Sequence, residues 1–158
     1  MNYNEYLANR LNEVLLSGKW VSGTNFKEQI ADVTWTEARK KVGNLNSISS
    51  ITFHINYYLS GVMDVFNGGE LTIRDKYSFD SPEIKSEADW NLQKEKFVKD
   101  SESFVQIVQN METERLMDVF VKEEYGTFFR TVDVIIEHAY YHLGQIVLIK
   151  KQMREVGS

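Results

Sequence analysis

The sequence FFRTVDVIIEHAYYHLGQIVLIKKQM, residues 128–153, has the tightest helical periodicity in this chain of 158 residues. Apolar side chains recur along it at intervals of three and four residues, and a second apolar stripe leaves only a narrow polar strip. A helix this apolar is central to its domain, or it also meets a partner chain. The first stripe consists of Phe128, Val132, Ile135, Ala139, His142, Ile146, Ile149 and Met153.

Three more segments have the periodicity of long helices, and one short helix is predicted ahead of the second of them. Each begins at a polar residue that can accept hydrogen bonds from the first free N–H groups, and three end at glycine. The segments between them, residues 19–33, 70–88 and 112–126, are expected to be irregular. The predicted caps are Asn2 or Asn4, Thr34 with Glu37, Asn46 or Ser47, and Ser86 with Asp89; the predicted stops are Gly18, Gly43 and Gly68–Gly69.

Two details of these segments can be checked against the fold. Trp20, Phe26 and Ile30 are the expected apolar anchors of the first connector. In the third long helix, Lys94 and Ser101 interrupt the apolar stripe, so this helix is expected to be the most exposed of the four.

Length and composition indicate a single all-α domain over residues 1–158. A chain of this size buries roughly 70% of its unfolded surface, and its one proline is compatible with long helices. The predicted fold is an antiparallel four-helix bundle with short extra helices in the connectors. The alternative is an irregular α-domain in which the same helices cross at larger angles.

The charge pattern excludes several classes of function. The net charge is −5 and no cluster of Lys or Arg could neutralise a phosphate backbone, so nucleic acid is not an expected partner. No uncharged apolar run is long enough to span a membrane, and the first residues lack the apolar core of a signal peptide, so we expect a cytoplasmic protein. Cysteine is absent, so any metal must be held by nitrogen and oxygen, and any thiol must come from a small-molecule substrate.

The three histidines form the candidate functional site. His138 and His142 are four residues apart, which puts both rings on one face of the last helix. His54 lies beside the apolar stripe of the second long helix, and these two helices can face each other across a bundle. Three neutral imidazoles on one divalent cation leave a coordination position open, as in catalytic zinc sites. The alternative is that the histidines are core residues, each hydrogen-bonded to a carbonyl or an acid.

The segment EHAYYHLGQ, residues 137–145, resembles the signature H-x-x-x-H-x-G-Q of the DinB/YfiT-like superfamily. SSITFHINYY, residues 49–58, resembles the segment that supplies the third histidine of that superfamily. The strings WVSGTNFK (20–27), GNLNSI (43–48), KYSFD (76–80) and PEIKS (82–86) are similar to its subgroup of unknown function, the DUF1572 type. The likeness covers nearly the whole chain.

This resemblance implies a four-helix bundle, often a homodimer, with a divalent metal on His54, His138 and His142. Zinc or nickel is the expected ion, with iron or manganese as alternatives. Characterised relatives include bacillithiol transferases and a mycothiol-dependent isomerase, which use a low-molecular-weight thiol. The implied function is a metal-dependent enzyme, of the thiol transferase or hydrolase type, acting on a small molecule. The alternatives are a noncatalytic metal- or ligand-binding dimer, and a helical dimerisation domain with packed histidines.

Further residues are candidates for the pocket or for support of the metal ligands. Tyr57 and Tyr58 follow His54 by one turn and can line the pocket, although both can equally be core aromatics. Gln145 can orient a ligand or hydrogen-bond across the bundle. Glu137 can accept a histidine N–H, or it can be a solvated surface acid, as can Asp133. Gly144, next to Gln145, can permit a close approach of a neighbouring backbone or can be a tolerated small residue.

Overall fold

The computed structural model describes residues 2–155, and this part of the chain is helical, without a β-strand. An isolated bridge joins Val119 to Thr127. The predicted all-α class is confirmed. The α-helices are α1 (Tyr3–Asn12), α2 (Phe26–Ala31), α3 (Trp35–Arg39), α4 (Ile48–Phe66), α5 (Glu87–Asn110) and α6 (Phe128–Glu155), and the shorter turns are the π-helix η1 (Glu13–Ser17) and the 3₁₀ turns η2 (Asp75–Tyr77), η3 (Thr113–Met117) and η4 (Glu123–Tyr125).

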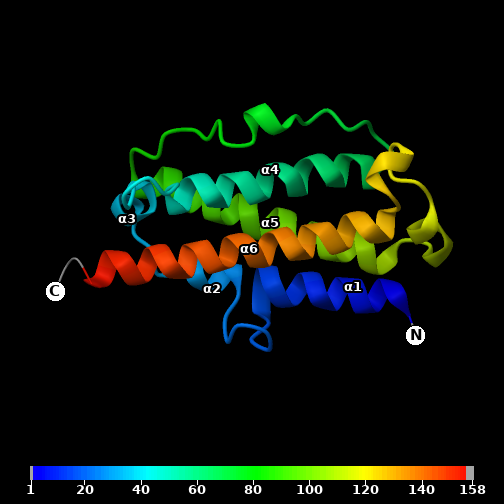
Figure 1. Cartoon of the computed structure of the whole chain (residues 1–158), viewed down its shortest axis with the longest axis horizontal. Helices are drawn as coiled ribbons and strands as arrows, with labels where there is room; N and C mark the ends of the chain where they lie inside the picture. The colour runs from blue at the N-terminus through cyan, green and yellow to red at the C-terminus, as the bar shows by residue number, and fades with distance from the viewer. Residues whose placement is uncertain (1, 156–158) are drawn as a thin grey trace.

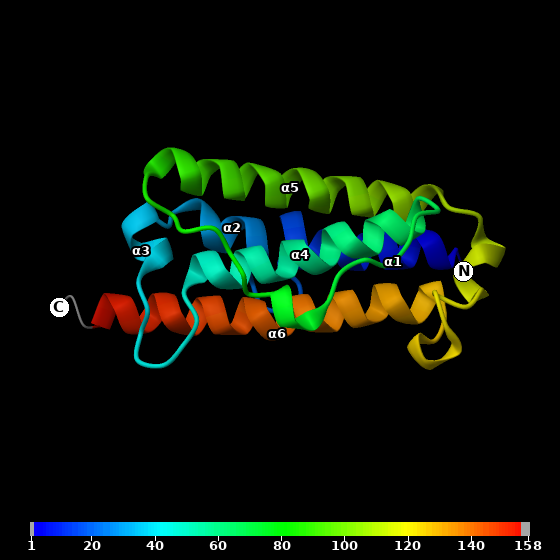
Figure 2. The ribbon, with the colours of Figure 1, turned by 90° about the horizontal axis from the view of Figure 1, so that it is seen from above.

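The helices α1, α4, α5 and α6 lie side by side along the long axis of the molecule (Figure 1). Phe66 at the end of α4 packs on Phe128 at the start of α6, which shows that the two helices run in opposite directions. α4 and α5 run in the same direction, with Gln93 bonded to Ser49 near their starts (Figure 2). The antiparallel alternation expected from the sequence is therefore incomplete, because the connector after α4 returns along the whole helix before α5 begins.

That connector, residues 67–85, is called the strap below. It runs back over α4 as extended chain interrupted by η2 (Figure 2). Tyr57 of α4 holds it twice, since its hydroxyl donates to the carbonyl of Arg74 and accepts from the N–H of the same residue, at 3.0 and 2.8 Å. Ile73 of the strap packs on Gly61 so closely that a Cβ at position 61 would collide with it. The strap is thus a fixed part of the fold.

The core lies between the four long helices, and large apolar side chains from all of them fill it. Trp90, Phe97 and Phe104 of α5 are fully buried, so this helix is central on its apolar face. α5 is largely exposed outside this face, as expected, since 6 of its 24 residues are buried against 12 of 19 in α4. Ser101, however, is fully buried and does not open the stripe to solvent. Its side chain is small enough for the neighbouring helix to cover it, a packing effect that helical periodicity does not encode. Within residues 2–155, no helix is long and apolar enough to cross a membrane.

Most of the predicted helix starts are confirmed. Asn2, Ser47 and Ser86 accept hydrogen bonds from N–H groups in the first turns of α1, α4 and α5. Thr34 and Glu37 form the reciprocal capping box of α3. That helix ends at Arg39, earlier than the predicted stop near Gly43, because the chain turns into extended backbone at Lys40.

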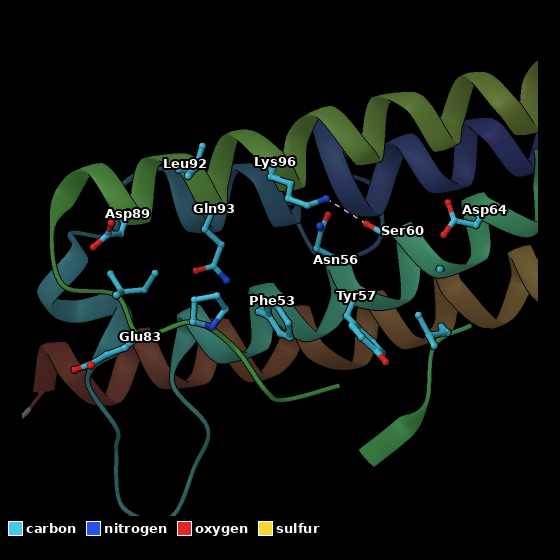
Figure 3. Close-up of a pocket in the computed structure, with 14 residues that line it drawn as sticks. Phe53, Asn56, Tyr57, Ser60, Asp64, Glu83, Asp89, Leu92, Gln93 and Lys96 are labelled. Atoms are coloured by element: carbon cyan, nitrogen blue, oxygen red, sulfur yellow. Dashed lines mark hydrogen bonds between the residues drawn. The ribbon is translucent and has the colours of Figure 1, made fainter. Parts of the chain in front are cut away.

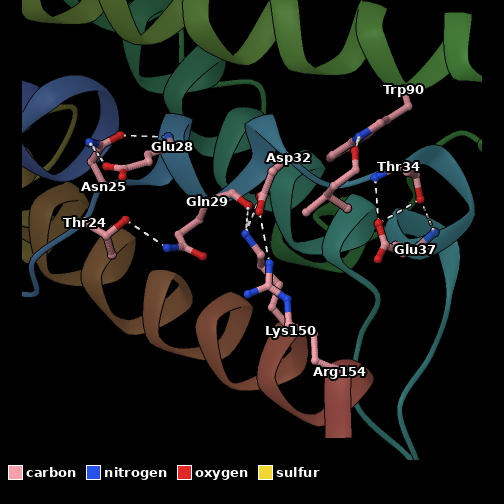
Figure 4. Close-up of polar contacts among 11 residues, drawn as sticks. Thr24, Asn25, Glu28, Gln29, Asp32, Thr34, Glu37, Trp90, Lys150 and Arg154 are labelled. Atoms are coloured by element: carbon pink, nitrogen blue, oxygen red, sulfur yellow. Dashed lines mark hydrogen bonds and ion pairs between the residues drawn. The ribbon is translucent and has the colours of Figure 1, made fainter. Parts of the chain in front are cut away.

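The first connector contains a helix that the sequence did not indicate, α2. Its anchors Phe26 and Ile30 are buried as predicted, but Trp20 is 90% exposed, so its assignment as an anchor was wrong. Polar contacts fix this region to the long helices (Figure 4). The buried ammonium of Lys150 binds Asp32 at 2.5 Å, and the indole of Trp90 donates to the carbonyl of Val33 at 2.8 Å. The first connector is therefore packed against α5 and α6.

Candidate metal centre

The three histidines meet between α4 and α6. The Nε2 atom of His138 lies 3.1 Å from Nε2 of His54 and 3.0 Å from Nε2 of His142. One ligand atom from each ring lies within 4.8 Å of the others. His54 and His142 are buried, and His138 is half-buried. The antiparallel packing of α4 on α6 brings His54 and His138, 84 positions apart in the chain, to one point. This is the arrangement predicted from the helix faces on which the histidines lie.

The outer nitrogens of two rings are held by acceptors. Nδ1 of His54 donates to the main-chain carbonyl of Ser78 at 3.2 Å. Nδ1 of His142 donates to Oε1 of Gln145 at 2.7 Å. Both acceptors lack a proton to give, so both rings carry their hydrogen on Nδ1 and turn an Nε2 lone pair toward His138.

This arrangement has more lone pairs than protons at its centre. A neutral His138 ring carries at most one hydrogen on Nε2, so only one of its two short Nε2–Nε2 contacts can be an ordinary hydrogen bond. A cation at the centre would satisfy all three nitrogens. Two nitrogens at ~2.0–2.1 Å from one tetrahedral zinc ion lie roughly 3.3 Å apart. The two contacts of His138 are a few tenths of an ångström shorter than this, whereas the ligand atoms of His54 and His142, within 4.8 Å of each other, would draw together around the ion. The donor set fits a divalent metal.

The pKa values of the three histidines favour their neutral form. Burial, reinforced by the neighbouring imidazoles, lowers the pKa of His54 and of His138 to about 4. Burial also lowers the pKa of His142, against the opposing effect of its hydrogen bond to Gln145. Near pH 7 the three rings are neutral, which is the form in which imidazole binds metals.

Aromatic side chains surround the rings on several sides. Phe79 of the strap stacks on His54, with ring centroids 3.9 Å apart and planes 12° from parallel. Tyr58 meets His54 and His138 edge-on and donates its hydroxyl to Asp75 at 2.9 Å. Burial raises the pKa of this phenol, so it stays protonated. These rings limit the access of water to His54 and fix its orientation.

The remaining candidates occupy different surroundings. Tyr57 is bonded to the strap, on the neighbouring face of α4, and does not contact the three rings. Glu137 and Asp133 both pair with Arg130 on the surface of α6, so neither supports a histidine. Gly144 faces open space within the described chain, with no neighbour for an added Cβ. Gln145 bonds to a ring on its own helix and not across to another helix.

The sequence reasoning missed the contribution of the strap. Asp75, Ser78 and Phe79 reach the site, and no role was predicted for any of them. The one signal was the string KYSFD at residues 76–80, which contains two of these residues and belongs to the family resemblance.

Residues 3–157 match the profile of a family described as "Protein of unknown function (DUF1572)". The chain belongs to the DUF1572 family. Searches among curated proteins and among solved structures returned no match. Membership in DUF1572 thus brings no known reaction, and the chemistry of the site rests on its own residues.

Proposed function

We propose that this DUF1572 protein is a metal-dependent enzyme whose divalent ion is held by His54, His138 and His142. The support is the convergence of three neutral rings, two of them fixed with an Nε2 lone pair toward the common point. A purely structural cluster of buried histidines would gain more from alternating donors and acceptors. A shared cation removes the conflict at the centre.

The bound ion would act as a Lewis acid and lower the pKa of a water or thiol at its open position. The chain's own residues supply orientation and shielding. Ser78 and Gln145 hold two rings in one tautomer, while Phe79 covers His54. Because the chain has no cysteine, a thiol transferase needs a low-molecular-weight thiol as cosubstrate, whereas a hydrolase would use water. Zinc or nickel suits three imidazoles best, ahead of iron or manganese.

The second candidate is a noncatalytic site that stores or senses a metal or a small ligand. One observation favours it: among the described residues, no carboxylate hydrogen-bonds to any of the three rings. A catalytic water or thiol then lacks an obvious proton acceptor. Asp75, reached through Tyr58, is the carboxylate that the contacts connect to the rings.

Our proposal also covers the wider grouping of this chain. We assign it to the DinB/YfiT-like superfamily, with a four-helix bundle and a homodimer in the cytoplasm, on the basis of the motifs at residues 49–58 and 137–145. Sedimentation of the purified protein tests the dimer.

The deciding experiment is metal analysis of protein purified without a nickel column. We expect about one divalent ion per chain, and its loss in His54→Ala and His142→Ala variants that remain helical by circular dichroism. A metal-free wild-type protein that also fails to bind added zinc or nickel would refute the metal site. Consumption of bacillithiol or glutathione with a panel of electrophiles then separates the two candidates, because a binding protein leaves every thiol unchanged.

A further inference from the structure

A cleft of about 550 Å³ lies between α4, α5 and the strap (Figure 3). This volume is in the range of small-molecule sites, which are mostly apolar with a few convergent polar groups. It opens on the face of α4 that carries Phe53 and Tyr57, next to the face that carries His54. Nothing in the metal-site proposal uses it.

Apolar side chains form most of the cleft wall. Phe53 and Tyr57 come from α4, Ile73 and Ile84 from the strap, and Leu92 from α5. Leu92 is 68% exposed and adds an accessible apolar surface to the edge of the cleft. The walls therefore suit an apolar body of the size of a fused aromatic ring with a short chain.

The charged groups of the cleft are not equally available. The ammonium of Lys96 is bound to Asp100 and lies 3.3 Å from the hydroxyl of Ser60. Glu83 pairs with two cations, and Asp89 accepts the main-chain N–H of Lys85 and so closes the strap onto α5. Asp64 lines the cleft at an exposed position, and its carboxylate has no hydrogen bond or ion pair to the described residues (Figure 3). Among the described charged groups of the cleft, the uncommitted one is thus negative.

The polar wall is also short of a hydrogen-bond donor. Asp100 accepts from Asn56, Ser60 and Lys96, so the donors of this group converge on one carboxylate. Oδ1 of Asn56 is left without a partner, although Asn56 is 93% buried, since its exposed fraction is 7%. A buried acceptor in this state costs roughly 1–3 kcal/mol. This oxygen is covered by protein atoms, so it shows that acceptors exceed donors in this wall but is not itself a contact for a ligand.

We propose that the cleft binds an organic cation, an ammonium group on an apolar body, with the ammonium directed to Asp64. Phe53, Ile73 and Leu92 take the apolar part. The site is separate from the histidines and goes beyond the proposed metal-dependent activity. A negative binding result at the cleft would therefore not contradict the proposed metal site.

The test uses three dyes that differ only at one end. Each carries a dansyl group on a five-carbon chain that ends in an ammonium, an acetamide or a carboxylate, and the dansyl fluorescence rises when the ring leaves water. We expect saturable binding in which the ammonium dye binds about fivefold more tightly than the acetamide dye. The carboxylate dye should bind most weakly. A fivefold preference is about 1 kcal/mol, the size of one charge pair at 4 Å in water.

Three variants locate the binding. Asp64→Asn keeps the shape of the wall and should equalise the ammonium and acetamide dyes, whereas Glu114→Gln, at an exposed acid outside the cleft, should keep the preference. Leu92→Gln, at an exposed position that the fold tolerates, should weaken all three dyes severalfold. Circular dichroism confirms that each variant is folded.

Several results would overturn the proposal. Absence of saturable fluorescence, equal affinity for the three dyes, or a preference that survives in Asp64→Asn each contradicts it. Dye binding that is unchanged in Leu92→Gln contradicts it as well. Displacement of the dye by stoichiometric zinc would place the dye at the histidines and not in the cleft.

Discussion

Replacing Gln145 by methionine tests how the proposed metal ligands are oriented. The change keeps the length of the side chain but removes the acceptor 2.7 Å from Nδ1 of His142. A hydrogen bond between neutral groups contributes about 0.5–1.5 kcal/mol, and one to a charged group about 1.5–3 kcal/mol. A metal on Nε2 makes the ring a stronger donor, so the bond gains about 1–1.5 kcal/mol when the ion binds. Its loss should weaken zinc affinity about tenfold, the lower end of the usual effect of such supporting residues.

The assay is titration of metal-free protein with zinc in competition with a chromophoric chelator at fixed pH. Gln145→Glu keeps an acceptor and adds a negative charge, so this variant should bind zinc at least as tightly as the wild type. Gln106→Met makes the same chemical change at an exposed position of α5 and should have no effect. The reasoning fails when Gln145→Met binds zinc within twofold of the wild type, or when Gln145→Glu loses as much affinity as Gln145→Met.

Three further predictions concern stability. In urea unfolding, Gly61→Ala should cost about 1–3 kcal/mol because the new methyl group collides with Ile73, whereas Gly144→Ala should stabilise by about 0.5–1 kcal/mol; the opposite signs would contradict the packing described. Trp90→Phe should cost at least about 1–3 kcal/mol, since a buried carbonyl loses its donor, and a loss below ~0.5 kcal/mol in the same assay would show that the indole N–H is dispensable. Burial raises the pKa of Asp100, but the hydrogen bonds from Lys96, Asn56 and Ser60 together lower it by more. The net result is a pKa below the usual value of an aspartate. Its contribution to stability is therefore present above pH ~4 and lost as the pH falls below it, and the difference between wild type and Asp100→Asn should shrink from pH 7 to pH 3. A difference that is constant with pH would refute this assignment.

Local chemistry made much of the fold predictable. The caps at Asn2, Ser47 and Ser86, and the box of Thr34 with Glu37, depend on a few neighbouring residues, so the sequence reveals them directly. The helical spacing of His138 and His142 is equally local. That His54 lies opposite them follows once α4 and α6 pack in opposite directions.

Tertiary packing decided the features that the sequence did not reveal. The common direction of α4 and α5 depends on a connector whose path has no helical or strand periodicity. Ser78 acts through its main-chain carbonyl, a group that every residue possesses, so its side chain gave no signal. Trp20 was predicted as an anchor of the first connector, but it precedes the turn around Gly23, which has a φ of 69°, and lies in solvent.

The strap exists because two neighbouring helices start at the same end of the molecule, which obliges the chain to travel back between them. That return places one stretch of irregular backbone against both the imidazoles and the cleft. Substitutions within this stretch could alter ligand preference at either place while the four long helices stay as they are. In this architecture, one irregular segment contributes to two neighbouring places, whereas the histidines and most of the cleft wall belong to the helices themselves.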